Sequence, residues 1–451
     1  MLNSEFDKKL VLTVNAIKYT IKHLFMVAWP EILNEISIEV AADKLSAITT
    51  IRGKRIVFCI SSYTEIDQLL NGVMTLNSIT TADKENEIPV CLKENFPFAE
   101  INDDGLQVNA DIISLSFIML SRYEEKIVKE RDSLDRFESR NSIAVKYNFI
   151  DFPIVDEYVL ILQTYLKEYF PEQNFTIPEC KIIPTHDIDE VRRFAGFKKT
   201  IRTLLGDIYL YKNIFTFFKS LKQCLVSINN PSKDPYLIAI NELIKISDKF
   251  NLTSEFYFMG AQLTKYDCGY NTMTSSVQKM LTLIQYHGMI VGFHGGFYTS
   301  INSALFKKEK EQIEAAVGHT VVGGRQHYLR FDVNDTFDIQ ESCGMEYDST
   351  LGYADREGFR CGTCHEFHPY DLKNDKAYKI KERPLIVMDA TLYSYRGYSI
   401  EKAYQQMERL YKRCKAVGGN FVLLWHNNAV ARETKWFKKV YCRFIENCYN
   451  V

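Results

Sequence analysis

Residues 182–190, Ile-Ile-Pro-Thr-His-Asp-Ile-Asp-Glu, form a short apolar run that ends in two carboxylates. If this run is a strand, side chains alternate between its faces, so Asp187 and Asp189 point the same way, roughly 7 Å apart along the backbone. Two acids on one face at a strand end suit a metal site or acid-base chemistry, although a solvated surface strand could carry such a pair as well. His186 faces away by the same alternation, so we predict a structural role for it.

Helix and strand patterns alternate from residue 235 to the end of the chain. Helices are predicted at 237–250, 276–287, 304–317, 336–343 and 399–417, and strands at 254–260, 289–294, 321–329, 345–351, 358–362, 385–392 and 420–426. Repeated βα units imply a parallel sheet, and about seven or eight of them can close into a barrel. We therefore expect the chemistry at the carboxyl ends of the strands.

The first part of the chain has a different, mixed α/β pattern. It predicts helices at 10–29, 112–123 and 153–170, strands at 36–40 and 51–60 with a turn at 52–54, and a loop at 127–150. The segment 171–178 contains two prolines and is the best linker candidate. We place the boundary near residue 176, between an N-terminal α/β domain (1–176) and a barrel domain (177–451).

Composition favours an ordinary soluble protein. Of 451 residues, 46% are hydrophobic and 25% are charged, and the net charge of −2 disfavours nucleic-acid binding. The N-terminus lacks the pattern of a secretion signal, and no apolar run approaches the ~20 residues that span a bilayer. The 11 scattered cysteines fit reduced thiols, so we expect a cytoplasmic protein.

A basic and aromatic segment at about 194–230 interrupts the βα pattern. Its periodicity predicts a helical excursion from the barrel domain. We expect this excursion to pack on the domain, with contact to a membrane surface or to a partner as the alternative.

Polar side chains gather at or near the predicted strand ends. They are Asp187, Asp189, His294, Arg325, Gln326, His327, Arg330, Asp348, Arg360, Asp389 and His426. Two histidines and a carboxylate can hold a divalent metal. A second carboxylate, held ionised by an arginine, can act as a base, and a further histidine can protonate a leaving group.

Several motifs together resemble the NodB-type polysaccharide deacetylases, carbohydrate esterase family 4. They are Thr185-His186-Asp187-Ile188-Asp189, Gly292-Phe293-His294-Gly295-Gly296, Arg325-Gln326-His327-Tyr328 and Leu423-Leu424-Trp425-His426. Residues 324–331, 347–353 and 358–362 are similar to a bacterial branch of this superfamily, whose members carry an N-terminal domain of unassigned function. Residues 120–125 and 153–158 resemble that N-terminal domain.

The resemblance implies a deformed (β/α) barrel that removes an N-acetyl group, or alternatively an O-acetyl group, from a carbohydrate with the help of a divalent metal. Zinc is the expected metal, with cobalt, nickel or manganese as alternatives. By position in the motifs, Asp187 would be the general base and Asp189 and His294 metal ligands. Arg325 would steady the base, and His426 would protonate the leaving group.

One position departs from the family pattern. The second metal histidine usually follows the first by four residues, and here that position is Tyr298. We favour His327 as the substitute ligand, while weak metal binding or lost hydrolysis are the alternatives. Tyr298, Arg360 and Asp389 are candidate substrate-binding residues, and the last two could instead orient His426 or form ordinary ion pairs.

Two other functions remain open. A catalytically silent glycan-binding or scaffolding protein could keep the barrel without the metal, and an amidase could act on a small non-sugar amide, because a fold does not fix the substrate. The sequence makes no prediction of the oligomeric state.

Overall fold

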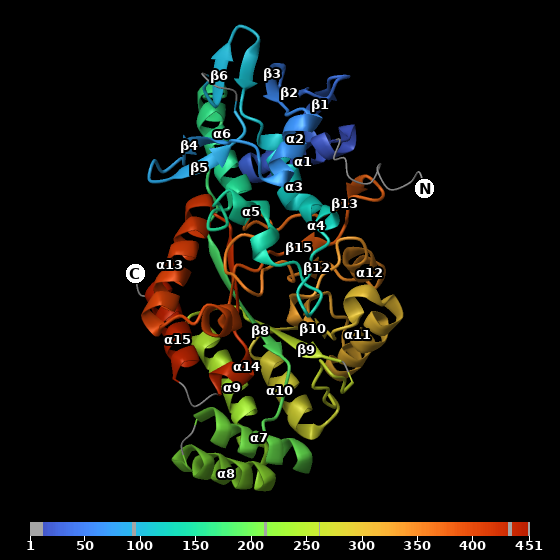
Figure 1. The fold of residues 1–451 in the computed structure, drawn as a ribbon, viewed down its shortest axis with the longest axis vertical. Coiled ribbons are helices and arrows are strands. Elements are labelled where there is room, and N and C mark those ends of the chain that lie inside the picture. Colours follow the sequence, from blue (N-terminus) through green and yellow to red (C-terminus); the bar gives the residue numbers. More distant parts are fainter. Residues whose placement is uncertain (1–11, 93–95, 212–213, 261, 432–434, 450–451) are drawn as a thin grey trace.

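The structure is a computed structural model that describes residues 12–92, 96–211, 214–260, 262–431 and 435–449. An N-terminal α/β region lies at one end of the molecule, and a barrel-like region makes up the rest (Figure 1). The predicted boundary near residue 176 falls between helix α6 (Ile154–Tyr169) and strand β8 (Lys181–Ile188).

A curled sheet of eight parallel strands forms the centre of the C-terminal region. Its order is β15-β12-β11-β10-β9-β8-β17-β16, and every neighbouring pair runs parallel. This confirms the predicted α/β class with a deformed barrel. The other strands are β9 (Glu255–Met259), β10 (Ile290–Gly295), β11 (Gly323–Gln326), β12 (Tyr347–Asp348), β15 (Lys381–Glu382), β16 (Val387–Met388) and β17 (Asn420–Leu424).

Helices alternate with the strands along the chain and lie around the sheet (Figure 1). They are α9 (Pro235–Lys249), α10 (Ser275–Tyr286), α11 (Ser303–Val317), α12 (Thr336–Ser342), α13 (Ile400–Val417), α14 (Asn427–Val430) and α15 (Trp436–Tyr449). The five helices predicted in this region are confirmed. Local chemistry sets their ends, as in α13, where the Ser399 side chain accepts from the Lys402 N–H and Gly418 ends the helix at a φ of 70°.

The N-terminal region is built on a mixed sheet with the order β1-β2-β3-β7-β6. The strands are β1 (Ser37–Val40), β2 (Ser46–Ile51), β3 (Lys54–Cys59), β6 (Ala99–Asn102) and β7 (Gly105–Val108), and β4 (Asn77–Thr80) pairs with β5 (Glu87–Val90). The helices are α1 (Val14–Ala28), α2 (Tyr63–Asn71), α3 (Ile112–Ser121), α4 (Tyr123–Ile127), α5 (Ile143–Lys146) and α6. The three predicted helices are confirmed, although residues 10–11 lie outside the described residues.

Four predicted strands differ from the structure. The predicted strand 345–351 is present only as β12, and the predicted strand 385–392 is β16 followed by a helical segment that begins at Asp389. The predicted strand 358–362 is wrong, because these residues bond to the N-terminal region: the Phe359 N–H donates to the Ile150 carbonyl, and Gly362 accepts from the Val155 N–H, each at 2.8 Å. The predicted strand 321–329 ends at Gln326, where the backbone turns.

A buried ion network joins the two regions. Glu125, in the middle of α4, binds Arg122 at 2.8 Å and Arg360 at 2.7 Å, and all three side chains are almost fully buried. Arg122 also donates to the carbonyl of Arg360. Removing one member would leave a buried charge unpaired, so this network holds the regions in one arrangement.

Helices α7 (Phe197–Tyr211) and α8 (Ile214–Asn229) form the helical excursion. They lie together at the end of the molecule opposite the N-terminal region (Figure 1). Across the described parts of the chain, no helix combines the length and the apolar character that crossing a bilayer requires.

Candidate metal centre

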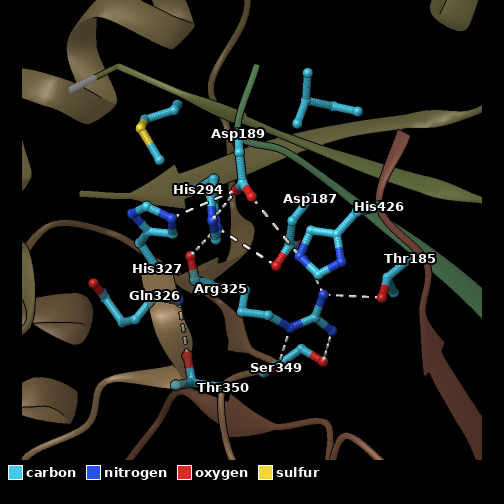
Figure 2. Close-up of polar contacts among 12 residues, drawn as sticks. Thr185, Asp187, Asp189, His294, Arg325, Gln326, His327, Ser349, Thr350 and His426 are labelled. Atoms are coloured by element: carbon cyan, nitrogen blue, oxygen red, sulfur yellow. Dashed lines mark hydrogen bonds and ion pairs between the residues drawn. The ribbon is translucent and has the colours of Figure 1, made fainter. Parts of the chain in front are cut away.

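Three side chains from neighbouring strand ends meet at one point. Among the described residues, Asp189, His294 and His327 offer ligand atoms that all lie within 4.8 Å of one another. Asp189 Oδ1 is 3.3 Å from His294 Nε2 and 3.7 Å from His327 Nε2. Figure 2 shows both imidazole rings facing the carboxylate.

The register of the sheet brings these side chains together. Strand β10 pairs with β9 on one side and β11 on the other, with His294 opposite Arg325. Asp189 follows β8, which pairs with the other side of β9, and His327 directly follows β11. Carboxyl ends of parallel strands meet at one edge of the sheet, so residues 138 positions apart become neighbours.

A sharp turn places His327. Tyr328 and Leu329, the two residues after it, have φ angles of 62° and 57°, in the left-handed region that non-glycine residues seldom adopt. This conformation costs of order 1–3 kcal/mol at each residue, so the surrounding contacts must hold it. Residues held in such strained turns often lie at functional sites.

Each histidine is oriented through its Nδ1 atom. The His294 Nδ1 atom lies 3.0 Å from the Arg325 carbonyl, and the His327 Nδ1 atom lies 2.8 Å from Asp267 Oδ1. Both partners are acceptors here, so each Nδ1 carries the proton. In each neutral ring the lone pair is therefore on Nε2, the atom that faces Asp189.

Two atoms of the group have no other partner. Asp189 Oδ1 and His294 Nε2 are buried, and neither makes a hydrogen bond. A buried polar atom without a partner is costly, and a cation between these atoms would satisfy both. The donor set of two imidazole nitrogens and one carboxylate oxygen is a set that zinc accepts, with room for a further ligand.

The electrostatics of the group also favour a cation. Burial by itself would raise the pKa of Asp189, but the contacts with His294, His327 and His426 lower it well below its usual range. Burial would lower the pKa of His294, and the carboxylates of Asp187 and Asp189 raise it instead. The carboxylates therefore attract positive charge to this point.

Asp187 lies beside the group and is held by Arg325. One guanidinium nitrogen of Arg325 donates to Asp187 Oδ1 and to the Thr185 hydroxyl, each at 2.9 Å. The other two nitrogens donate to the carbonyl and the hydroxyl of Ser349. Because Arg325 is fixed at every nitrogen, Asp187 is held in one orientation, as Figure 2 shows.

His426 faces the group from the end of β17. Its Nδ1 atom lies 2.7 Å from Asp389 Oδ1, and its Nε2 atom lies 3.9 Å from Asp189 Oδ2. Burial would lower the pKa of His426, but Asp389 and the two aspartates of the site raise it to about 10. In the metal-free protein His426 is therefore protonated at neutral pH.

The structure places the three predicted substrate-binding residues in different surroundings. Asp389 is buried and bound to His426, the alternative that we considered for it. Arg360 is not brought into the group, because it is buried and its guanidinium binds Glu125 and the Gly352 carbonyl. Tyr298 is 44% exposed and lies beside Phe297 and Tyr266, and it is not one of the three residues that supply ligand atoms.

Asp267 is a member of the site that the sequence did not indicate. Its carboxylate accepts from His327, from the Phe297 N–H at 2.9 Å and from the Thr264 hydroxyl at 2.8 Å. Burial would raise the pKa of Asp267, but these three donors lower it. It lies in a loop and not at a strand end, so the βα pattern carries no signal for it.

Comparisons with known proteins give three results. The sequence profile of a family of unknown function (DUF7033) matches residues 11–171. A search of curated proteins gives no match. Among solved structures, a Mycobacterium smegmatis protein assigned as a polysaccharide deacetylase has a TM-score of 0.40 and 16% identity, over 60% of this chain and 85% of its own.

Two further solved structures are similar at lower levels. Puue allantoinase has a TM-score of 0.35 and 13% identity, over 47% of this chain and 67% of its own. A CE4 family pseudoenzyme from Bacillus anthracis has a TM-score of 0.30 and 8% identity, over 61% of this chain and 63% of its own. Because these TM-scores are low, we base the function on the geometry of the site and not on these likenesses.

Proposed function

We propose that this protein is a metal-dependent hydrolase that removes an N-acetyl group from a carbohydrate, with an O-acetyl group as the alternative substrate. The observation that carries the proposal is the meeting of Asp189, His294 and His327, with two buried ligand atoms that lack hydrogen bonds. Zinc is the metal that we expect, and cobalt, nickel and manganese can bind the same donors.

The chain supplies a base and an acid on either side of this group. A divalent metal held there would polarise an acyl carbonyl and lower the pKa of a water molecule. Asp187 would accept the proton of the attacking water, because Arg325 occupies only its Oδ1 atom and leaves Oδ2 to act. His426 would donate a proton from Nε2 to the leaving nitrogen, since Asp389 holds the proton on Nδ1.

The surroundings of the site support a sugar. Phe297, Tyr298 and Tyr266 form an aromatic group beside His327, and the rings of Tyr266 and Phe297 stack at 3.8 Å. Tyr328 stacks on His327 itself at 4.1 Å. Phe297 is buried between Tyr266 and the guanidinium of Arg330, so Tyr298 is the most exposed ring of this group. An exposed aromatic ring near convergent polar groups suits a sugar ring, which carries both C–H faces and hydroxyls.

Metal binding and acetate release test the proposal together. The purified protein, loaded with zinc, is expected to bind about one equivalent and to release acetate from acetylated amino sugars. Asp189→Asn should lose both properties, while Asp371→Asn, which also removes a buried carboxylate, should keep both.

The rival functions give different results in the same assays. A protein that takes up no zinc, cobalt, nickel or manganese would be the silent glycan-binding protein. Release of acid from simple amides but not from acetylated sugars would indicate a small-molecule amidase. Either result would contradict the proposed function.

A further inference from the structure

The α7–α8 hairpin lies at the surface of the molecule and exposes several large apolar side chains. Among the side chains whose burial is described, Ser220 and Ser227 are fully buried on its inward side, and Asp207 is only 7% exposed. Its outward side carries large apolar residues. A surface hairpin in water is expected to have the opposite arrangement, with the apolar stripe facing the protein.

Polar contacts attach the inward side to the barrel. Arg193, which is buried, binds Asp207 of α7 at 2.6 Å. The same guanidinium donates to the Ser220 hydroxyl at 3.4 Å and to the Gln223 side chain at 3.3 Å, both on α8. These polar contacts hold the inward side of the hairpin on the barrel.

Those apolar side chains form stripes on the outward side. On α7, residues four positions apart lie on one face: Phe197, Ile201, Leu205 and Tyr209, which are 80%, 42%, 61% and 83% exposed. On α8, the exposed apolar residues include Phe218, Leu225, Val226 and Ile228. Monomeric proteins seldom expose so many large apolar side chains together, so this face is expected to contact something.

The charge of the hairpin indicates what kind of surface its apolar face would contact. Residues 197–229 contain six cations and one acid, a net charge of +5, while the whole chain has a net charge of −2. The acid, Asp207, is paired on the inward side. By helical spacing, Lys198 and Arg202 fall beside the apolar stripe of α7, and both belong to the outward side.

We propose that the α7–α8 hairpin docks on an anionic lipid bilayer and lies in its interface. Apolar side chains flanked by lysine and arginine match the two parts of such a surface, the acyl boundary and the negative headgroups. A second copy of this chain is a poorer match, since two hairpins that each have a net charge of +5 would meet and repel, even though Lys199 is paired with Glu190.

A cavity lies between the start of α7 and the segment that follows β8. It has a volume of about 750 Å³, and its lining includes Phe197 and Lys198 of α7 and Glu190, the residue after Asp189. The inference goes beyond the proposed function and does not depend on it.

Sedimentation with vesicles tests the docking. The purified full chain is expected to sediment with phosphatidylcholine vesicles that contain phosphatidylglycerol, and roughly tenfold less with phosphatidylcholine alone. The double variant Leu205→Ser/Leu225→Ser should lower binding by at least about tenfold, since two large apolar side chains leave the interface. The control Val73→Ser/Tyr286→Ser, which removes exposed apolar residues elsewhere, should bind as the wild type does.

Two further variants keep the test decisive. Lys198→Glu/Arg202→Glu should abolish the preference for phosphatidylglycerol without touching an apolar residue. Asp189→Asn should bind vesicles normally, which separates docking from the metal-dependent activity.

Three outcomes would overturn the inference. They are a wild type that sediments with neither vesicle, a Leu205→Ser/Leu225→Ser variant that binds as tightly as the wild type, and a wild-type oligomer that this variant converts to monomers in sedimentation velocity. The last outcome would assign the face to a second copy of the chain.

Discussion

Replacing Asp267 tests whether His327 acts as a metal ligand. In Asp267→Asn the side-chain oxygen can still accept from His327 and from the Phe297 N–H, so the ring is expected to keep its orientation. At His327 only the charge of the acceptor is lost, while the Thr264 hydroxyl, which donates to Oδ2, faces the amide NH2 group instead. Asp267→Ala removes the acceptor as well, and the imidazole becomes free to rotate.

The structure sets the size of the two effects. A hydrogen bond to a charged acceptor contributes about 1.5–3 kcal/mol and a neutral one about 0.5–1.5 kcal/mol, so Asp267→Asn loses roughly 1–1.5 kcal/mol at His327. Zinc affinity should then fall about tenfold. For Asp267→Ala we expect a loss near a hundredfold, the upper end for residues that orient a ligand.

Competition with a chromogenic chelator measures the zinc dissociation constant of each variant. Asp371→Asn is the matched control, because Asp371 is also buried and also accepts backbone N–H groups, those of Lys373 and Asn374. His327→Ala gives the loss of zinc affinity that is expected when the ligand itself is removed. If Asp267→Ala binds zinc as tightly as the wild type while His327→Ala does not, Asp267 has no part in orienting the ligand. If His327→Ala also binds normally, His327 is not a ligand.

Three other perturbations follow from the structure. Asp389→Asn removes the main group that raises the pKa of His426, so His426 should lose its proton at lower pH. The alkaline limb of the pH-rate profile should therefore move to lower pH by about 1–3 units. A limb that does not move would exclude His426 as the acid. Burial raises the pKa of Glu157 from 4.5 to about 7, so folding favours its protonated form and the free energy of unfolding should fall as the pH rises from about 4.5 to about 7. Glu157→Gln should remove up to about 3 kcal/mol of that fall, and denaturant unfolding at pH 5 and pH 8 would show an unchanged fall if the carboxyl is not responsible. Gly324→Ala would place a Cβ atom 2.0 Å from the Phe293 carbonyl oxygen, so it should push β11 from β10 and weaken zinc binding in the chelator assay, unlike Gly206→Ala, where the space is open.

Long apolar strands were the most predictable part of this protein. Strands β8, β9, β10 and β17 lie in the interior of the sheet and bury most of their residues on both faces, so each contains a clear apolar stretch. Strands β12, β15 and β16 are only two residues long, too short for any periodicity to show. The pairing partner, and not the local sequence, decides where such strands begin and end.

The roles of the charged residues were less predictable, because their partners come from distant parts of the chain. Arg360 and His327 have the same sequence signal, a polar residue at or near a predicted strand end. Arg360 binds Glu125, 235 residues earlier, and is therefore part of the contact between the two regions. His327 meets Asp267 and Asp189, from two other segments. The spacing of these residues along the chain does not indicate which of them become neighbours in the fold.

The second histidine of the site, His327, comes from a different strand than His294, and this changes which parts of the fold set the distance between the two imidazoles. With both histidines on one segment, their separation would be fixed by that segment alone. Here the residue four positions after His294 is Tyr298, which lies among aromatic rings, and His327 comes from the adjacent strand. The distance between the two imidazoles therefore depends on the register of β10 against β11 and on the strained turn at Tyr328. Asp267 holds His327 after that turn, so at the proposed metal site a loop outside the sheet would contribute to the metal affinity.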